Sequence, residues 1–264
     1  MTAAALLLAM IGFADLARSL VRDQSGFPAQ TPGPAKGLNQ RSKRAMALII
    51  GCLWALLLCG AIWLLGLGWG WALGATAVAG AWLATTTSRE NATAIFRLWP
   101  ALGVLVATTV FALFETHDPA ANTPVGRWYS SSAPEWIQVF PLTSVIMALG
   151  VGVFLIESTN IVVRSALYPG SIHPPSGMGA LSEPLPDLRG GRLIGPLERL
   201  GLLTLTLAGM FTIVAALIAA KGIVRFPEIS NDQQGGSKAE YFLVGSLVSW
   251  GVAMLGVGLI HISG

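Results

Sequence analysis

Charged residues are scarce in this sequence. Asp, Glu, Lys and Arg make up 11% of the 264 residues, whereas 53% are hydrophobic, and a soluble domain carries about 25% charged residues. A soluble chain of this composition could not cover its own surface with polar groups, so a soluble globular fold is excluded. The composition implies the lipid bilayer as the first partner, because a surface that faces lipid needs no polar cover.

The alternation of apolar and polar residues that a transmembrane barrel requires is also missing. The chain has long apolar runs instead, and in lipid such runs form helices because every backbone N–H and C=O must be paired within its segment. The predicted fold is all-α: a polytopic integral membrane helix bundle with about seven transmembrane helices, or six plus an N-terminal interfacial helix. Segment 1–20 leaves both alternatives open, because its apolar part ends at Phe13 and is short for a span.

A single membrane domain, 1–264, is expected. It comprises an N-terminal helix with a basic Pro/Gly loop (1–44), a four-span core (45–163), a cytoplasmic Pro/Gly-rich loop (164–196) and a C-terminal two-span hairpin (197–264). The expected spans beyond the first segment are 45–65, 69–86, 93–113, 137–163, 197–220 and 240–262. Small residues recur around the second of these spans and predict close helix packing there; they are Gly66, Gly70, Gly74 and Gly80.

Metal and catalytic motifs are lacking. No H-E-x-x-H, C-x-x-C or P-loop pattern occurs, and the aspartates are too scattered for a Mg²⁺ cluster. His173 and Ser176 are close in sequence but have neither an orienting acid nor an oxyanion site, which nucleophilic catalysis requires. Cys52 and Cys59 lie about 10 Å apart along a helix, too far for a disulfide. We expect no metal, no cofactor and no catalytic residue, and the sequence leans away from an enzyme.

Lysine and arginine predict the orientation. They concentrate in 18–44, 89–97 and 164–199, and cytoplasmic loops carry an excess of these residues. This pattern, rather than nucleic-acid binding, accounts for the net charge of +3. It predicts a multi-pass protein of the bacterial cytoplasmic (inner) membrane with its C-terminus in the cytoplasm. The segment from Lys221 to Lys238 then violates the rule, so either it folds back into the protein or its basic residues have a function.

The first candidate site is Glu157 with Asn160, near the cytoplasmic end of the span 137–163. A carboxylate inside a membrane is costly unless it is paired or hydrated, so it is a functional hypothesis by default. The functional interpretation places Glu157 and Asn160 on the path of a solute or ion. The structural interpretation pairs Glu157 with a neighbour such as Arg164 or Arg192.

The second candidate site lies in the C-terminal third of the chain. Lys221 and Arg225 are four residues apart on one helical face, where like charges repel, so an acidic partner such as Glu228 or Glu240 is expected. One interpretation is a site for an anionic ligand or a partner, and the other is a salt-bridge network that fixes the hairpin. The ligand or partner candidates also include residues around the start of the preceding span; they are Arg192, Glu198 and Arg199.

Three stretches in this region carry a resemblance: GRLIGPLER, AAKGIVRFPE and EYFLVGSL. In order and spacing, residues 191–250 resemble a module of a family of uncharacterised bacterial polytopic membrane proteins. The resemblance implies a bacterial membrane protein with a recurring helical hairpin, and it implies no activity. It covers about a quarter of the chain.

Three functions fit these patterns. The first is a non-catalytic subunit or scaffold of a larger bacterial membrane complex, bound to other membrane subunits or to copies of itself. The second is a transporter or channel for a small solute or ion, which predicts a water-accessible cavity that reaches Glu157. The third is a membrane enzyme that acts on a lipid headgroup, with the basic and acidic residues around Lys221 as the anion site.

Overall fold

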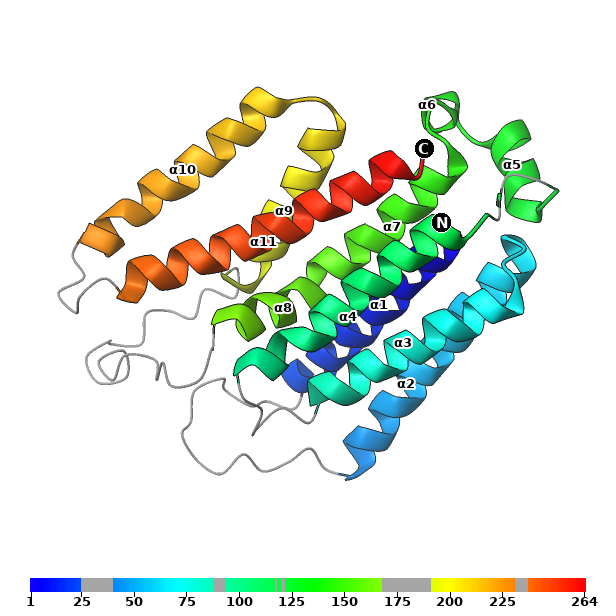
Figure 1. Cartoon of the computed structure of the whole chain (residues 1–264), viewed down its shortest axis with the longest axis horizontal. Helices are drawn as coiled ribbons and strands as arrows, with labels where there is room; N and C mark the ends of the chain where they lie inside the picture. Colours follow the sequence, from blue (N-terminus) through cyan, green and yellow to red (C-terminus); the bar gives the residue numbers. More distant parts are fainter. Residues whose placement is uncertain (25–39, 88–93, 117, 120–121, 168–190, 231–236) are drawn as a thin grey trace.

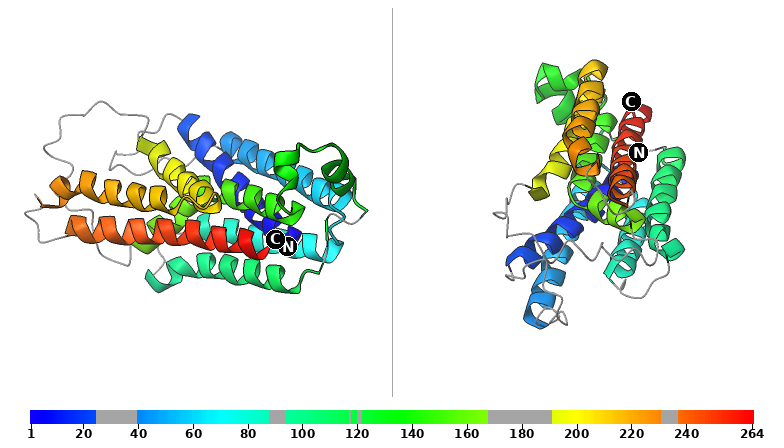
Figure 2. Two further views of the ribbon diagram at one scale, coloured as in Figure 1. Left: turned by 90° about the horizontal axis from the view of Figure 1, so that it is seen from above. Right: turned by 90° about the vertical axis from the view of Figure 1, so that its left-hand side faces the viewer.

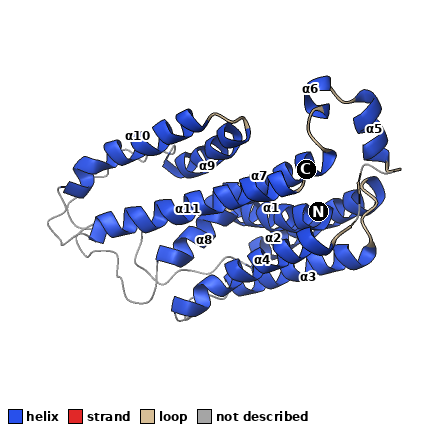
Figure 3. Ribbon diagram, turned by 45° about the horizontal axis from the view of Figure 1, so that its top comes forward, coloured by secondary structure: helices blue, strands red, loops and turns tan. Residues whose placement is uncertain are grey.

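A computed structural model of the chain describes all residues except 25–39, 88–93, 117, 120–121, 168–190 and 231–236. Helices form almost the whole described part, and no strand occurs in it (Figures 1 and 3). The all-α bundle is thus confirmed. The helices are α1 (Thr2–Gln24), α2 (Gln40–Cys59), the short π-helix η1 (Gly60–Leu64), α3 (Trp69–Thr87), α4 (Ala94–Phe114), α5 (Pro124–Ser132), α6 (Glu135–Gln138), α7 (Leu142–Ile156), α8 (Ser158–Leu167), α9 (Gly191–Leu207), α10 (Phe211–Ser230) and α11 (Ser237–Ile262).

Several of these helices have the length and composition of a membrane span. Thr2–Val21, Arg44–Leu64 and Phe242–Ile262 qualify singly, and α7 and α8 qualify together as one bent span. Leu98–Phe114 and Phe211–Val224 are shorter apolar helices. A helical bundle with three or four candidate spans among the described residues supports a membrane protein, and the expected number of seven stays a prediction.

Helix α1 is the centre of the bundle (Figure 1). It packs against α2, α3, α4, α7 and α8, most extensively against α7. Leu7, Met10 and Ile11 have no exposed surface, because the run of alanine and leucine in α1 presents apolar side chains on every face. This burial among five helices places α1 inside the bundle, and both alternatives for segment 1–20 stay predictions.

The closest helix packing depends on glycines other than the expected ones. A Cβ on Gly150 would lie 2.5 Å from the carbonyl oxygen of Ala5, and one on Gly12 would lie 2.8 Å from the backbone of Val153. The backbones of α1 and α7 therefore touch. In the expected ridge of α3, a Cβ on Gly70 or Gly80 would meet nothing within 4 Å.

The expected single helix over 197–220 is wrong, because the chain turns between α9 and α10. Gly209 has a φ of +73°, the left-handed conformation that glycine adopts without steric cost. The N–H of Gly209 donates to Thr206 O (3.0 Å) and that of Met210 to Leu205 O (2.9 Å), the Schellman pattern that ends helices. α9 and α10 consequently form a hairpin, and α10 returns toward the end at which α9 began (Figure 1).

The bundle has two distinct ends. Both termini lie at one end, here called the terminal end, together with α5, α6 and the turn at Gly209 (Figures 1 and 3). The opposite end, here called the basic end, holds the ends of helices at Gln24, Gln40, Leu167, Ser230 and Ser237. This arrangement decides at which end each charged residue lies.

Candidate functional site

The expected span 137–163 is broken inside the bundle. α7 ends at Ile156 and α8 begins at Ser158, with an angle of 50° between them. Glu157 at the junction has a φ of −122° and a ψ of −39°. The residues after the break, Ser158, Thr159 and Asn160, have short polar side chains that compete with helical hydrogen bonds. Two helix ends are thus left inside the protein, where their backbone groups need partners.

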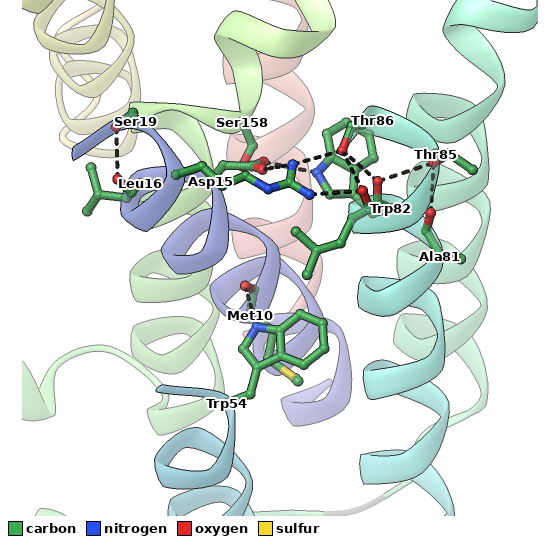
Figure 4. Close-up of polar contacts among 12 residues, drawn as sticks. Met10, Asp15, Leu16, Ser19, Trp54, Ala81, Trp82, Thr85, Thr86 and Ser158 are labelled. Carbon is green, nitrogen blue, oxygen red and sulfur yellow. Dashed lines mark hydrogen bonds and ion pairs between the residues drawn. The ribbon is translucent and has the colours of Figure 1, made fainter. Parts of the chain in front are cut away.

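The N-terminus of α8 faces the carboxylate of Asp15, a residue of α1 that is 1% exposed. Ser158 Oγ donates to Asp15 Oδ2 at 2.7 Å, and Trp82 Nε1 donates to the same oxygen at 2.9 Å (Figure 4). An anionic group at a helix N-terminus is stabilised by the helix dipole. Asp15 therefore joins α1, α3 and α8 through one buried carboxylate.

Arg18, one helical turn after Asp15, neutralises this carboxylate. Its Nη1 lies 3.1 Å from Asp15 Oδ1 and donates to Thr86 Oγ1 at 2.9 Å, while Nη2 donates to Leu83 O at 2.9 Å. The guanidinium thus binds α3 as well as α1. Charge and hydrogen-bond capacity are satisfied together, which a buried ion pair requires.

The C-terminus of α7 faces a cation, Arg199 of α9, which is 4% exposed. Arg199 Nη1 donates to the carbonyl oxygen of Leu155 at 3.2 Å and to Asn160 Oδ1 at 2.8 Å. Arg199 Nε donates to Ser249 Oγ of α11 at 2.7 Å. A continuous helix would pair the Leu155 carbonyl with the N–H four residues later, and at the break the guanidinium bonds to it instead. The charge also suits the negative end of the α7 dipole.

Glu157, the first candidate from the sequence, is half-buried at this break. Its Oε2 accepts a hydrogen bond from Asn160 Nδ2 at 3.3 Å, and Asn160 in turn accepts one from Arg199. Arg164, one of the expected partners of Glu157, is exposed. Glu157 and Asn160 are thus brought together as expected, and Arg199 is added to them from the second candidate site.

The neighbouring residue, Glu198, forms an ion pair with Lys221 of α10. The Lys221 Nζ lies 2.8 and 2.7 Å from the two carboxylate oxygens, and Trp250 Nε1 donates to Glu198 Oε1 at 2.6 Å. Lys221 Nζ also lies 5.2 Å from the ring centroid of Trp250 and 5.8 Å from that of Phe242, within the range of cation–π attraction.

Glu198 is an acidic partner of Lys221 that the sequence did not suggest. Glu228 and Glu240 were expected in this role because they follow Lys221 at short range. The turn at Gly209 instead places α9 and α10 antiparallel, so that residues 198 and 221 face each other. The side chains of Arg192, Arg225, Glu228 and Glu240 lie outside the described part of the structure.

These groups form one continuous feature, here called the charged belt, since Glu157 adjoins Ser158 and Glu198 adjoins Arg199. It crosses the bundle from α3 to α10 and contains equal numbers of acids and bases. Its ionisable members are Asp15, Arg18, Glu157, Arg199, Glu198 and Lys221. Sequence reasoning missed Asp15 and Arg18, although an acid and a base three residues apart at the end of an apolar run were an available signal.

A separate acidic residue, Glu115, caps α1 at the terminal end. Its carboxylate accepts hydrogen bonds from Thr2 Oγ1 and from the backbone N–H of Ala3, the latter at 2.7 Å. The α-amino group of Met1 lies 3.0 Å from the same carboxylate. This is the anionic N-terminal cap that a buried helix start needs, and it lies apart from the belt.

A cavity of about 230 Å³ lies between α4, α7 and α11. Its lining is apolar and includes Leu8, Val104, Phe154 and Leu259. The lining reaches the residues just before the break, Phe154 and Leu155, and not the Glu157 carboxylate. This cavity is therefore not the hydrated path that the transport hypothesis predicted.

Within the described residues, no group of three or more His, Cys, Asp and Glu side chains is placed to hold a metal ion. Comparison with protein-family models, curated proteins and solved structures finds no match to this chain. The resemblance of residues 191–250 to a bacterial membrane module stays a prediction, and the function must be argued from the belt itself.

Replacing Arg199 with methionine is expected to destabilise the protein by about 2 to 4 kcal/mol, because it leaves the Leu155 carbonyl and Asn160 without their buried donor. The measurement is the midpoint of unfolding in detergent. Arg164→Met, which changes an exposed arginine, is the matched control and should stay within about 0.5 kcal/mol of the parent. Equal losses in the two variants would contradict a structural role of Arg199 at the break.

Proposed function

We propose that the protein is a multi-pass protein of the bacterial cytoplasmic membrane that transports a proton or a small cation across the charged belt. The observation that supports this proposal is the break at Glu157, with Asp15 at one of the two internal helix ends and Arg199 at the other. Transporters commonly place their ion sites at discontinuous helices near the middle of the membrane.

The energetic cost of the belt favours this function over simple packing. Charges inside a membrane are expensive and are found mostly along pathways of ions and protons. A bundle that needed only stability could fill the same positions with apolar side chains, often with no loss of stability. In the proposed mechanism, the incoming cation competes with Arg18 for the carboxylate of Asp15 and with Asn160 for that of Glu157. The apolar cavity does not reach Glu157, so the path opens in another conformation, for which the break supplies the backbone freedom.

The distribution of the basic residues supports a proposal for the orientation of the chain. Apart from the belt and from Arg127 in α5, every lysine and arginine within a described helix lies in the half nearer the basic end. They are Arg22, Arg41, Lys43, Arg44, Arg97, Arg164, Arg192, Arg225 and Lys238. The turn at Gly209 brings Arg225 and Lys238 to the same end as the others, so the expected violation of the positive-inside rule disappears.

We propose that the basic end is cytoplasmic and that the chain makes eight helical passes: α1, α2 with η1, α3, α4, α7 with α8, α9, α10 and α11. Both termini then lie outside the cytoplasm, whereas the sequence alone predicted a cytoplasmic C-terminus. Alkaline phosphatase fused after Gly264 should be active, and green fluorescent protein at the same position should stay dark. Fusions after Ser230 should show the reverse pattern. Fluorescence of the Gly264 fusion would refute this orientation.

Purified protein in liposomes should dissipate imposed gradients of protons, sodium or potassium faster than liposomes without protein. Glu157→Gln and Asp15→Asn are expected to slow the flux about tenfold, a change of about 1.4 kcal/mol in the barrier, in preparations that remain monodisperse. Glu135→Gln, on the exposed helix α6, is the control and should match the parent. The same assay is run with alkylammonium ions. Transport would be refuted if none of these ions crossed faster than in liposomes without protein.

A second candidate, a non-catalytic subunit of a membrane complex, is favoured by α10. This helix packs mainly against α9 at the edge of the bundle (Figure 2), and Phe211, Ile223 and Val224 are 67 to 73% exposed. Isolation from native membranes in mild detergent should then recover a stoichiometric protein partner. The third hypothesis, a lipid-headgroup enzyme, placed its anion site at Lys221, Arg225, Glu228 and Glu240, and the side chains of the last three lie outside the described part.

A further inference from the structure

The outer end of the charged belt has the composition of a site for an organic cation. The Glu198 carboxylate supplies the negative charge, and Trp250 and Phe242 each turn an aromatic ring toward the same point, 5.2 and 5.8 Å away. Aromatic faces beside a carboxylate are the combination that recognises alkylammonium ions. The three residues are here called the ammonium cage.

The cage already holds an alkylammonium group, the side chain of Lys221. Its Nζ contacts both oxygens of Glu198 at 2.7 and 2.8 Å. Trp250 has a second function here, because its indole N–H donates to Glu198 Oε1 at 2.6 Å and fixes the orientation of the carboxylate. The cage is therefore built around a cation by two residues of α11 and one of α9, whereas the cation comes from a third helix.

The helix that delivers the cation lies at the edge of the bundle (Figure 2). α10 packs mainly against α9, and the residues on either side of Lys221 are exposed. The cage is also more open than the Asp15–Arg18 end of the belt: the side chains of Lys221 and Glu198 are 28% and 13% exposed, against 0% for Asp15 and 11% for Arg18. A ligand at the surface of the bundle can reach this end of the belt.

We propose that the ammonium cage is a binding site for alkylammonium ligands, which displace the ammonium group of Lys221. The inference deepens the proposed function and rests on it where it names the class of transported cation. Glu198 directly precedes Arg199, which contacts the break, so a ligand at Glu198 is one residue from the groups that the transport proposal uses. The ligand is either a free alkylammonium ion or the ammonium of a lipid headgroup, and both present the same positively charged group to the cage.

The displacement of Lys221 can be measured on the unaltered protein. The chain has four lysines: Lys36, Lys43, Lys221 and Lys238. The protein in nanodiscs of phosphatidylglycerol is treated with excess acetylating reagent at increasing concentrations of tetramethylammonium chloride, which cannot itself be acetylated. Equal concentrations of sodium chloride are the control. Mass spectrometry of peptides should show that the rate of acetylation of Lys221 rises saturably, by about fivefold, which is equivalent to about 1 kcal/mol of cation–π attraction. The rates of acetylation of Lys43 and Lys238 should stay constant. No change at Lys221, or an equal change at all lysines, overturns the proposal.

Nanodiscs that contain phosphatidylcholine, whose quaternary ammonium cannot be acetylated, distinguish the two sources. A raised rate at Lys221 without added ligand assigns the site to a lipid headgroup, whereas a response to tetramethylammonium alone assigns it to a free cation. Either result supports the cage, and the absence of both refutes it.

A variant tests the cage directly. Lys221→Ala removes a propylammonium-sized group, so n-propylammonium should raise its unfolding midpoint saturably, and n-propanol should not. The double variant Lys221→Ala with Glu198→Gln, which lacks the charge of the cage, should not respond. If Lys221→Ala folds only when n-propylammonium is present during expression, that rescue supports the cage, and a failure of rescue refutes it.

Failure of this inference and failure of transport give different results. Ion flux without a response at Lys221 would retain the transport proposal and remove alkylammonium as its substrate. A response at Lys221 without any flux would retain the binding site and remove transport.

Discussion

Replacement of Gly150 with valine is expected to abolish stable folding of the bundle. A Cβ at this position would lie 2.5 Å from the carbonyl oxygen and 3.0 Å from the Cα of Ala5, so only a shift of the α1 or α7 backbone could make room. Overpacking costs about 1 to 3 kcal/mol where flexible side chains can move, and here the obstacle is backbone. We expect the loss to exceed that range, because α1 is the helix around which the others pack.

Gly103→Val is the matched control for this prediction. Gly103 lies in α4, is exposed, and a Cβ there would meet nothing within 4 Å. The two variants change the same atoms at a packed and an unpacked helical position. The recovery of monodisperse protein and the midpoint of unfolding in detergent should fall for Gly150→Val and remain near the parent value for Gly103→Val. Comparable behaviour of the two would show that α1 and α7 do not pack as closely as described.

The pair Gly150→Ala and Gly103→Ala provides a graded version of the same comparison. Alanine is favoured over glycine in a helix by about 1 kcal/mol, so Gly103→Ala should be neutral or stabilising. Gly150→Ala should be destabilising, since the same added Cβ meets the backbone of Ala5. If the same glycine-to-alanine change raises the unfolding midpoint at position 103 and lowers it at position 150, the loss at position 150 is due to the contact between α1 and α7 and not to helix propensity.

Asp15→Ala is expected to cost about 3 to 5 kcal/mol, the usual result of removing one partner from a buried ion pair. The carboxylate is buried and accepts hydrogen bonds from Ser158 and Trp82 in addition to its contact with Arg18. Its removal leaves the Arg18 charge inside the bundle without its acidic partner and leaves the indole N–H of Trp82 without its acceptor. The unfolding midpoint in detergent measures the loss.

Two further variants separate the charge from the hydrogen bonds. Asp15→Asn keeps an acceptor oxygen and loses the charge, so its loss should be smaller than that of Asp15→Ala. Combining Asp15→Ala with Arg18→Met removes both charges, and its loss should be clearly smaller than the sum of the single losses, as expected for coupled neighbours. Additive losses would show that Asp15 and Arg18 do not act as a pair. Glu135→Ala, at an exposed acid, should be close to neutral.

Asp15 also shows why sequence reasoning found only part of the site. Glu157 and Asn160 were recognised because they interrupt a long apolar run, where a carboxylate is conspicuous. Asp15 follows a shorter run, which left open whether segment 1–20 enters the membrane at all. Its importance depends on contacts with Trp82 and Ser158, 67 and 143 residues away in the chain, and no local pattern contains such pairings.

The second candidate site illustrates the same limit. Sequence spacing suggested Glu228 and Glu240 as partners of Lys221, because acids near in sequence are the simplest assumption for a helix and its connection. The structure pairs Lys221 with Glu198, 23 residues earlier. One glycine decides this outcome, because the left-handed conformation of Gly209 ends α9 and reverses the chain. A single glycine inside an apolar run does not by itself indicate a turn, since glycine also occurs within transmembrane helices.

The sequence by itself determined that this protein is helical and apolar enough for a membrane, because composition and the absence of strand alternation are properties of single segments. It also located the helices over 45–65, 69–86 and 240–262 and the polar interruption at Glu157, which are local features. The tertiary structure alone decided that α1 is central, that the span 137–163 is broken by 50°, that α9 and α10 form a hairpin and that six charged groups meet in one belt. These depend on backbone turns and on pairings between distant helices, in which buried charges and unpaired carbonyls find partners that segment-level energetics cannot specify.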